Sequence, residues 1–184
     1  MQKLKSLLAL ATVIALAATP LMAQQKRISP HETISKVIDK CRVTIIYGRP
    51  YTKDPKSGEP RKVWGELVPF GQVWRLGADE STLLVTEKTI EVGGLEVPPG
   101  AYAAFMLPAA DGSAKLILNK QVGQWGAFTY NESQDLGRVD LKKADSATPA
   151  DQFTMAIDKS PSGGGVIKLA WEKTEYSVPF TVKK

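Results

Sequence analysis

Hydrophobic and polar residues alternate with a period of two along much of this chain, a pattern typical of β-strands that bury one face. The alternation is clearest over residues 176–182, where one face carries Tyr176, Val178, Phe180 and Val182. Residues 153–157 and 42–47 repeat the pattern. After residue 23, no segment shows a sustained 3.6-residue hydrophobic repeat. The pattern therefore predicts an all-β protein.

Turn-forming residues divide the β-branched runs into short strands. We expect tight turns at Asp39-Lys40 and Asp111-Gly112, and a flexible turn over 160–165. Frequent short strands joined by such turns indicate a single antiparallel β-sandwich or jelly-roll-like barrel. The last two predicted strands are expected to pair with each other. The predicted strands are residues 33–38, 42–47, 82–86, 89–92, 101–107, 114–119, 138–141, 153–157, 166–172 and 176–182.

The first 23 residues have the layout of a secretory signal peptide. Lys3 and Lys5 precede an apolar run, and cleavage is expected near Ala23. An uncleaved membrane anchor is the alternative, but the apolar run is shorter than the roughly 20 residues that span a bilayer. We therefore expect export to the periplasm or the extracellular space. The expected parts are a signal peptide (1–23), a flexible leader (24–32) and one β-domain (33–184).

Charge and cysteine content narrow the range of partners. The chain carries 24 Lys and Arg against 19 Asp and Glu, a net charge of +5, which falls to +3 when Lys3 and Lys5 leave with the signal peptide. The positive charge is scattered, so we expect no nucleic-acid partner.

Cys41 is the single cysteine, and its apolar neighbours predict a buried side chain. No apolar span follows residue 23, so no transmembrane segment is expected in the mature chain.

The candidate site lies in residues 62–82, called the connector below, which combine apolar residues, glycines and a compact charged group. Arg75, Asp79 and Glu80 supply the charges, and Arg49 is expected to lie near them. In one interpretation these residues bind a ligand, because the planar guanidinium can hold a carboxylate, a phosphate or a sugar hydroxyl. In the other, an internal ion pair between Arg75 and Asp79 or Glu80 holds the connector to the sheet.

Aromatic residues offer a second candidate surface. Trp64, Trp74, Trp125, Tyr130 and Trp171 could stack against sugar rings, although aromatic residues more often build a core. Trp171 lies in an alternating strand and is predicted to be buried. Trp125 lies between glycines and is predicted to be exposed, which makes it the stronger candidate for binding.

The remaining ionisable residues do not form a recognised catalytic set. His31 is the only histidine, so a metal would need carboxylates such as Asp79 and Glu80, and we expect no metal site and no cofactor. Asp135 and Arg138 flank a turn, where either a salt bridge or a turn cap is expected. A pair of carboxylates such as Asp79 and Asp135 would allow a glycosidase-like hydrolase as the alternative function.

A series of short motifs runs through the chain after residue 23. They are Ser29-Pro30-His31-Glu32-Thr33, Tyr47-Gly48-Arg49-Pro50, Trp64-Gly65, Leu67-Val68-Pro69-Phe70-Gly71, Val73 to Thr82, Pro99-Gly100-Ala101-Tyr102, Asn119-Lys120, Gln124-Trp125-Gly126, Asp135 with Arg138-Val139, and Trp171-Glu172. Together these motifs resemble the DUF2911 family of exported bacterial proteins. The resemblance covers nearly the whole chain after residue 23 and implies an exported, mainly β domain, but no activity. Leu76 stands where threonine is common in the family, and Asp79 stands where asparagine is frequent.

These observations favour a non-catalytic binding or structural module for an envelope or extracellular ligand, with carbohydrate as one candidate. A carboxylate-dependent hydrolase and a purely structural interaction domain are the alternatives. The candidate ligand-binding residues are Arg49, Trp64, Trp74, Arg75, Asp79, Glu80 and Trp125.

Overall fold

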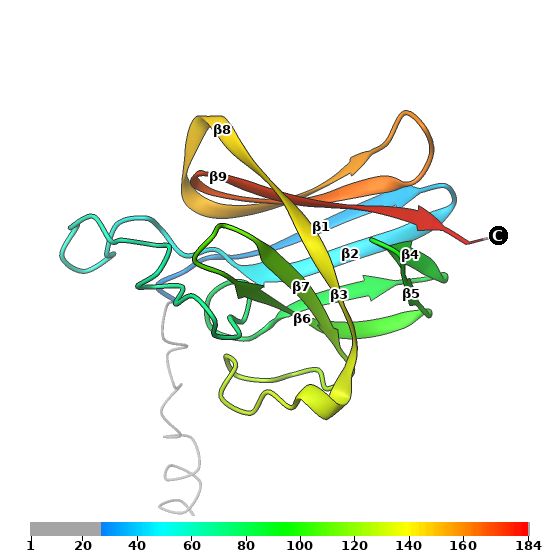
Figure 1. Cartoon of the computed structure of the whole chain (residues 1–184), viewed down its shortest axis with the longest axis horizontal. Coiled ribbons are helices and arrows are strands. Elements are labelled where there is room, and N and C mark those ends of the chain that lie inside the picture. The colour runs from blue at the N-terminus through cyan, green and yellow to red at the C-terminus, as the bar shows by residue number, and fades with distance from the viewer. Residues whose placement is uncertain (1–26, 184) are drawn as a thin grey trace, which may run out of the picture.

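A computed structural model describes residues 27–183 of the chain, and the predicted signal peptide lies outside the described residues. Nine antiparallel strands form one sheet in the order β1-β2-β3-β6-β7-β8-β9-β4-β5 (Figure 1). A short 3₁₀ helix, η1 (Glu132–Gln134), precedes β8, and no α-helix occurs in residues 27–183. The strands are β1 (His31–Ile38), β2 (Cys41–Gly48), β3 (Thr82–Thr86), β4 (Ile90–Val92), β5 (Leu95–Val97), β6 (Gly100–Pro108), β7 (Ala114–Asn119), β8 (Asp135–Lys159) and β9 (Gly165–Val182).

The predicted all-β class is confirmed, and the subdivision into sandwich or barrel stays a prediction. β3 and β7 coincide with the predicted strands 82–86 and 114–119. Asp39 and Lys40, at the turn between β1 and β2, both have positive φ angles, of 47° and 63°. That conformation suits the right-handed twist of a tight hairpin. Among the described residues, no helix is long and apolar enough to cross a membrane.

The predicted pairing of residues 166–172 with 176–182 is wrong, because both segments belong to the single long strand β9. β9 pairs with β8 from Lys159↔Gly165 to Lys142↔Ser177, and its last residues pair with β4. The intervening residues contain no glycine or proline, and the strand continues through a register irregularity at Glu172, where φ is +53°. β8 likewise joins the predicted strands 138–141 and 153–157 into one.

The core lies where the long strands cover the inner face of β2. In Figure 1, β8 and β9 run over β1 and β2, with β6 and β7 beneath. The phenol of Tyr47 on β2 is 1% exposed; its oxygen accepts a hydrogen bond from the backbone N–H of Met155 (2.8 Å), and its hydroxyl donates to Glu32 Oε2 (2.8 Å). Burial raises the pKa of Tyr47 to about 12. A buried and hydrogen-bonded tyrosine therefore joins β2 to β8 across the core.

A close backbone contact positions the end of the connector. Ala78 N donates to the carbonyl of Gly48 at 3.2 Å. A Cβ atom on Gly48 would lie 2.2 Å from the carbonyl oxygen of Ala78, so only glycine allows this approach. The contact brings the charged residues that follow Ala78 to the start of β1. β1 begins at His31, so His31 and Glu32, which we assigned to the leader, are strand residues.

Candidate functional site

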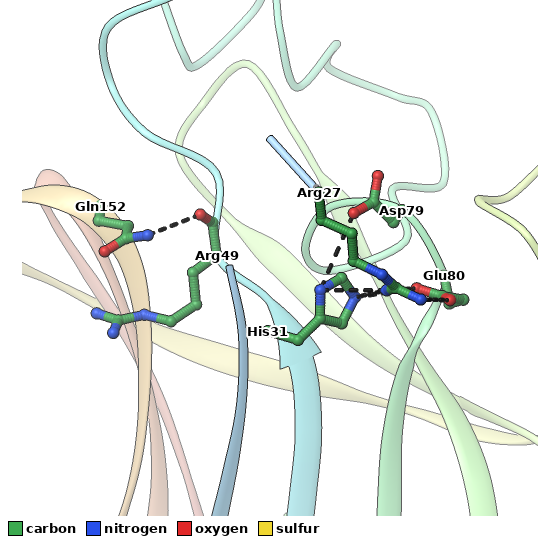
Figure 2. Close-up of polar contacts among 6 residues, drawn as sticks. All are labelled: Arg27, His31, Arg49, Asp79, Glu80 and Gln152. Atoms are coloured by element: carbon green, nitrogen blue, oxygen red, sulfur yellow. Dashed lines mark hydrogen bonds and ion pairs between the residues drawn. The ribbon is translucent and has the colours of Figure 1, made fainter. Parts of the chain in front are cut away.

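Four charged or ionisable side chains gather where the leader, β1 and the connector meet (Figure 2). The Arg27 guanidinium donates to both carboxylate oxygens of Glu80, at 2.6 Å and 2.7 Å. His31 Nε2 lies 2.9 Å from Glu80 Oε2, and His31 Nδ1 lies 4.0 Å from Asp79 Oδ2. The hydrogen bond from Arg27 is the largest factor that lowers the pKa of Glu80, to about 2. Glu80 is therefore held in its ionised form.

The predicted internal ion pair of Arg75 is wrong: the arginine that pairs with Glu80 is Arg27, and the two side chains are 45% and 38% exposed. We expected Arg75 to pair with Asp79 or Glu80. Among the described residues Arg75 forms no ion pair, and Arg27 of the leader binds Glu80 in its place. The bidentate geometry is the strong arrangement for an arginine and a carboxylate. The leader is thus joined to the connector by a specific contact that its polar sequence did not indicate.

Among the described residues, one group of side chains could supply ligands to a metal ion: His31, Asp79 and Glu80. One ligand atom from each residue lies within 4.8 Å of the others. Arg27 already donates to the Glu80 oxygen that faces His31, so a cation would have to compete with the guanidinium. The expectation of no metal site stays a prediction.

The connector approaches the cluster in an unusual backbone conformation. Leu76 and Asp79 both have positive φ angles, of 56° and 65°. Aspartate tolerates this region better than most residues, whereas leucine rarely adopts it. Asp79 O accepts from the N–H of Gly126 at 2.9 Å, which ties the connector to the loop that precedes η1. Trp125 in that loop is 60% exposed and pairs with Glu80 through a β-bridge, so its predicted exposure is confirmed.

A cavity of about 170 Å³, called the polar cavity below, lies between the connector and β9. Four of its lining residues carry a buried polar atom that has no hydrogen-bond partner among residues 27–183. Such atoms are rare in native proteins and call for an explanation. They are Arg61 Nε, Arg75 Nε, Trp171 Nε1 and Asp79 Oδ2, three donors and one acceptor.

Stacked tryptophans form the apolar wall of the polar cavity. Trp74 and Trp171 stack with centroids 5.8 Å apart and planes 20° apart, and Trp64 meets both edge-on. Trp171 is 1% exposed, as predicted, and Trp74 is 8% exposed. Trp74 therefore belongs to the core, the half-buried Trp64 packs against it, and the two do not form an exposed stacking platform.

Arg49 lies apart from the charged cluster (Figure 2). Its guanidinium bonds Phe153 O at 3.1 Å and Thr154 Oγ1 at 2.8 Å on β8, and lies 3.1 Å from Glu32 Oε2. Gln152 Nε2 donates to its carbonyl oxygen at 2.9 Å. The contacts of Arg49 therefore join β2 to β8, and none of them reaches Arg75 or Asp79.

The predicted salt bridge between Asp135 and Arg138 is confirmed, within a larger network. Arg138 Nε donates to Asp135 Oδ2 at 2.9 Å, and the Tyr130 hydroxyl donates to the same oxygen at 2.6 Å. Asn119 Nδ2 donates to Asp135 Oδ1 at 2.8 Å. Burial is the largest factor that raises the pKa of Tyr130 to about 12. Asp135 is thus fully engaged in holding the loop before η1.

Sequence reasoning missed two residues of this region, Arg27 and Arg61. Arg27 lies in the segment assigned to the leader, and Arg61 lies directly before the connector. A second, larger cavity of about 390 Å³ is lined by Arg27, His31 and Glu80 together with mainly apolar parts of β2 and β3. Its charged groups are already paired with one another, in contrast to those of the polar cavity.

The chain matches the family described as "Protein of unknown function (DUF2911)" over residues 29–180, and it belongs to that family. The match spans both the connector and the paired strands β8 and β9. No curated protein and no solved structure matches the chain.

Proposed function

We propose that this protein is an exported, non-catalytic binding module that holds a small polar ligand in the polar cavity. The observation that carries the proposal is that four residues lining one cavity each carry a buried polar atom without a hydrogen-bond partner among residues 27–183. Leaving such atoms unpaired costs free energy, about 1–3 kcal/mol for each neutral group and more for a charged one. A ligand that supplies the missing partners recovers this free energy.

The walls of the cavity suit a small molecule. Binding sites are concave and mainly apolar, with a few convergent polar groups that orient the ligand. Here Trp74, Trp171 and Leu67 supply apolar surface, and Arg61 and Arg75 supply charge. Hydroxylated ligands such as carbohydrates match this set, because each hydroxyl can both donate and accept a hydrogen bond.

The hydrolase alternative finds little support in the geometry. A glycosidase needs one protonated carboxylic acid and one free carboxylate. The pKa of Glu80 is about 2, so Glu80 is ionised at neutral pH and cannot act as the acid. Asp135 accepts hydrogen bonds from Tyr130, Arg138 and Asn119, which leaves no carboxyl pair of Asp79 and Asp135 free for catalysis.

Isothermal titration tests the proposal directly. The purified protein is titrated with a panel of mono- and disaccharides, small carboxylic acids and inorganic phosphate. We expect at least one class to bind, and we expect Arg75→Ala to abolish that binding. Arg42→Ala is the matched control, because Arg42 carries the same charge on an exposed site beside Glu87. Absence of binding across the panel by a folded protein would contradict the proposal and favour a structural role.

A further inference from the structure

We infer that the ligand of the polar cavity is a small hydroxy acid, a carboxylate with a neighbouring hydroxyl group; this rests on the proposed function. Its carboxylate is held by the guanidinium groups of Arg61 and Arg75 and by the indole N–H of Trp171. Its hydroxyl donates to Asp79 Oδ2.

The charge of the cavity selects an anion. Two arginines and one aspartate line it, which leaves one net positive charge. Glu80 does not change this balance, because Arg27 neutralises it at 2.6 Å. The Nε atoms of Arg61 and Arg75 are buried and unpartnered, so both guanidinium groups have a donor available. A ligand with a single negative charge neutralises the site and pairs these donors.

The indole of Trp171 makes the site specific for a hydrogen-bond acceptor. Trp171 is 1% exposed, and its Nε1–H has no partner among residues 27–183. An indole nitrogen can only donate, and a buried indole N–H usually has an acceptor. An oxygen of the bound carboxylate is such an acceptor.

Asp79 requires a donor on the same ligand. Its Oδ2 atom is buried without a hydrogen-bond partner, and His31 Nδ1 is 4.0 Å away, beyond hydrogen-bond distance. Either a hydroxyl or an ammonium group could donate to this oxygen. An amino acid would bring no net charge and would leave the site positive, whereas a hydroxy acid neutralises it. Charge therefore favours the hydroxyl.

The size of the cavity limits the ligand. A volume of about 170 Å³ is close to that of a cavity of about 150 Å³ that holds benzene, a molecule of six non-hydrogen atoms. That space suits a compound with roughly six or seven non-hydrogen atoms, such as lactate or glycerate. Trp74 and Leu67 line the cavity and would cover its carbon chain. A sugar acid presents the same carboxylate and hydroxyl but is larger.

Titration calorimetry with matched compounds tests the inference. The purified full chain is titrated with lactate and glycerate, and with three compounds that each change one feature. Propionate lacks the hydroxyl, glycerol lacks the carboxylate, and alanine carries an ammonium group. We expect each to bind at least about tenfold more weakly than glycerate, because each leaves a buried polar group unpaired or a charge unbalanced. Glucuronate distinguishes a free small acid from a sugar acid.

Variants locate the binding. Trp171→Phe keeps an aromatic ring against Trp74 and removes the indole donor together with part of the buried ring, and we expect about a tenfold loss of glycerate affinity. Arg75→Gln should weaken binding at least as much, and Arg42→Gln should leave it unchanged. Melting temperatures identify any variant that fails to fold. If Trp171→Phe fails to fold, the binding of glycerate by Arg75→Gln decides whether the polar cavity is the binding site.

The outcomes separate the two proposals. Preference for glycerate that is lost in Arg75→Gln supports both. Binding of neutral sugars or alanine that depends on Arg75, with glycerate no better than propionate, overturns the hydroxy-acid inference and leaves the binding module standing. No binding in this panel or in the wider one overturns both.

Discussion

The Arg27 guanidinium binds both carboxylate oxygens of Glu80 across 53 positions of sequence. The contact joins the segment before β1 to the last residues of the connector. Because Asp79 precedes Glu80, it also restrains the residue whose carboxylate lines the polar cavity. The position of the leader and the geometry of the candidate site therefore depend on each other.

Removal of Arg27 should raise the pKa of Glu80 and reduce stability in a defined pH range. The folded-state pKa of Glu80 is about 2, below its ordinary value of 4.5. Its contribution to stability is present above pH 4.5 and is lost as the pH falls toward 2. We expect Arg27→Gln to lower the melting temperature at pH 7 and to match the unchanged protein near pH 2. A carboxyl NMR titration of Glu80 measures the pKa directly. A Glu80 pKa near 4.5 in the unchanged protein would contradict the ion pair.

Substitution of Gly48 should disturb the connector. A Cβ at this position would lie 2.2 Å from Ala78 O, so Gly48→Ala must move the backbone that carries Asp79. We expect a loss of about 1–3 kcal/mol in the free energy of unfolding, typical of overpacking. Gly58→Ala is the comparison, because Gly58 has a positive φ but no atom within 4 Å of the added Cβ. Urea unfolding measures both, and an equal or smaller loss at Gly48 would argue against the close contact.

Loss of the Tyr47 hydroxyl should destabilise the junction of β2 and β8. Tyr47→Phe leaves Met155 N–H without its partner, and we expect a loss of about 1–3 kcal/mol. Tyr51→Phe, at a more exposed site, should change little. The folded-state pKa of Tyr47 is raised to about 12 from 10, so its contribution to stability is present below pH 10 and is lost as the pH rises through 12. Unfolding at pH 7 and above pH 10 would reveal both effects, and equal stabilities of the two variants would refute the bridge.

Arg75 and Arg138 should differ in their effects on stability. Arg138 bonds Asp135, Tyr130 and Glu132, so Arg138→Ala should cost about 1–3 kcal/mol. Arg75 has no ion pair among the described residues, and Arg75→Ala should leave stability nearly unchanged while removing ligand binding. Chemical denaturation of both variants is the measurement. A large loss of stability in Arg75→Ala would show that Arg75 has a structural role.

Local patterns were sufficient for the strand content of this protein. The period-two alternation over residues 42–47 placed Val43, Ile45 and Tyr47 on one face of a strand, and in β2 all three are at most 1% exposed. Turn chemistry predicted the hairpin at Asp39-Lys40, whose geometry depends on two adjacent residues. Burial of Trp171 followed from alternation along its strand, and burial of Cys41 followed from its apolar neighbours. These features depend on neighbours in sequence, which a single chain displays.

Only the tertiary structure decided which charges meet. Arg27 and Arg75 are both arginines beside apolar residues, and nothing local shows that Arg27 binds Glu80 while Arg75 keeps an unpartnered Nε. Residues 166–172 and 176–182 are joined into the single strand β9 by pairing with β8. This pairing compensates for the polar residues in the middle of β9. The sequence alone therefore showed that the connector combines apolar residues with a compact group of charged residues. The fold decided its partners, because ion pairs and cavities depend on distances between residues far apart in the chain.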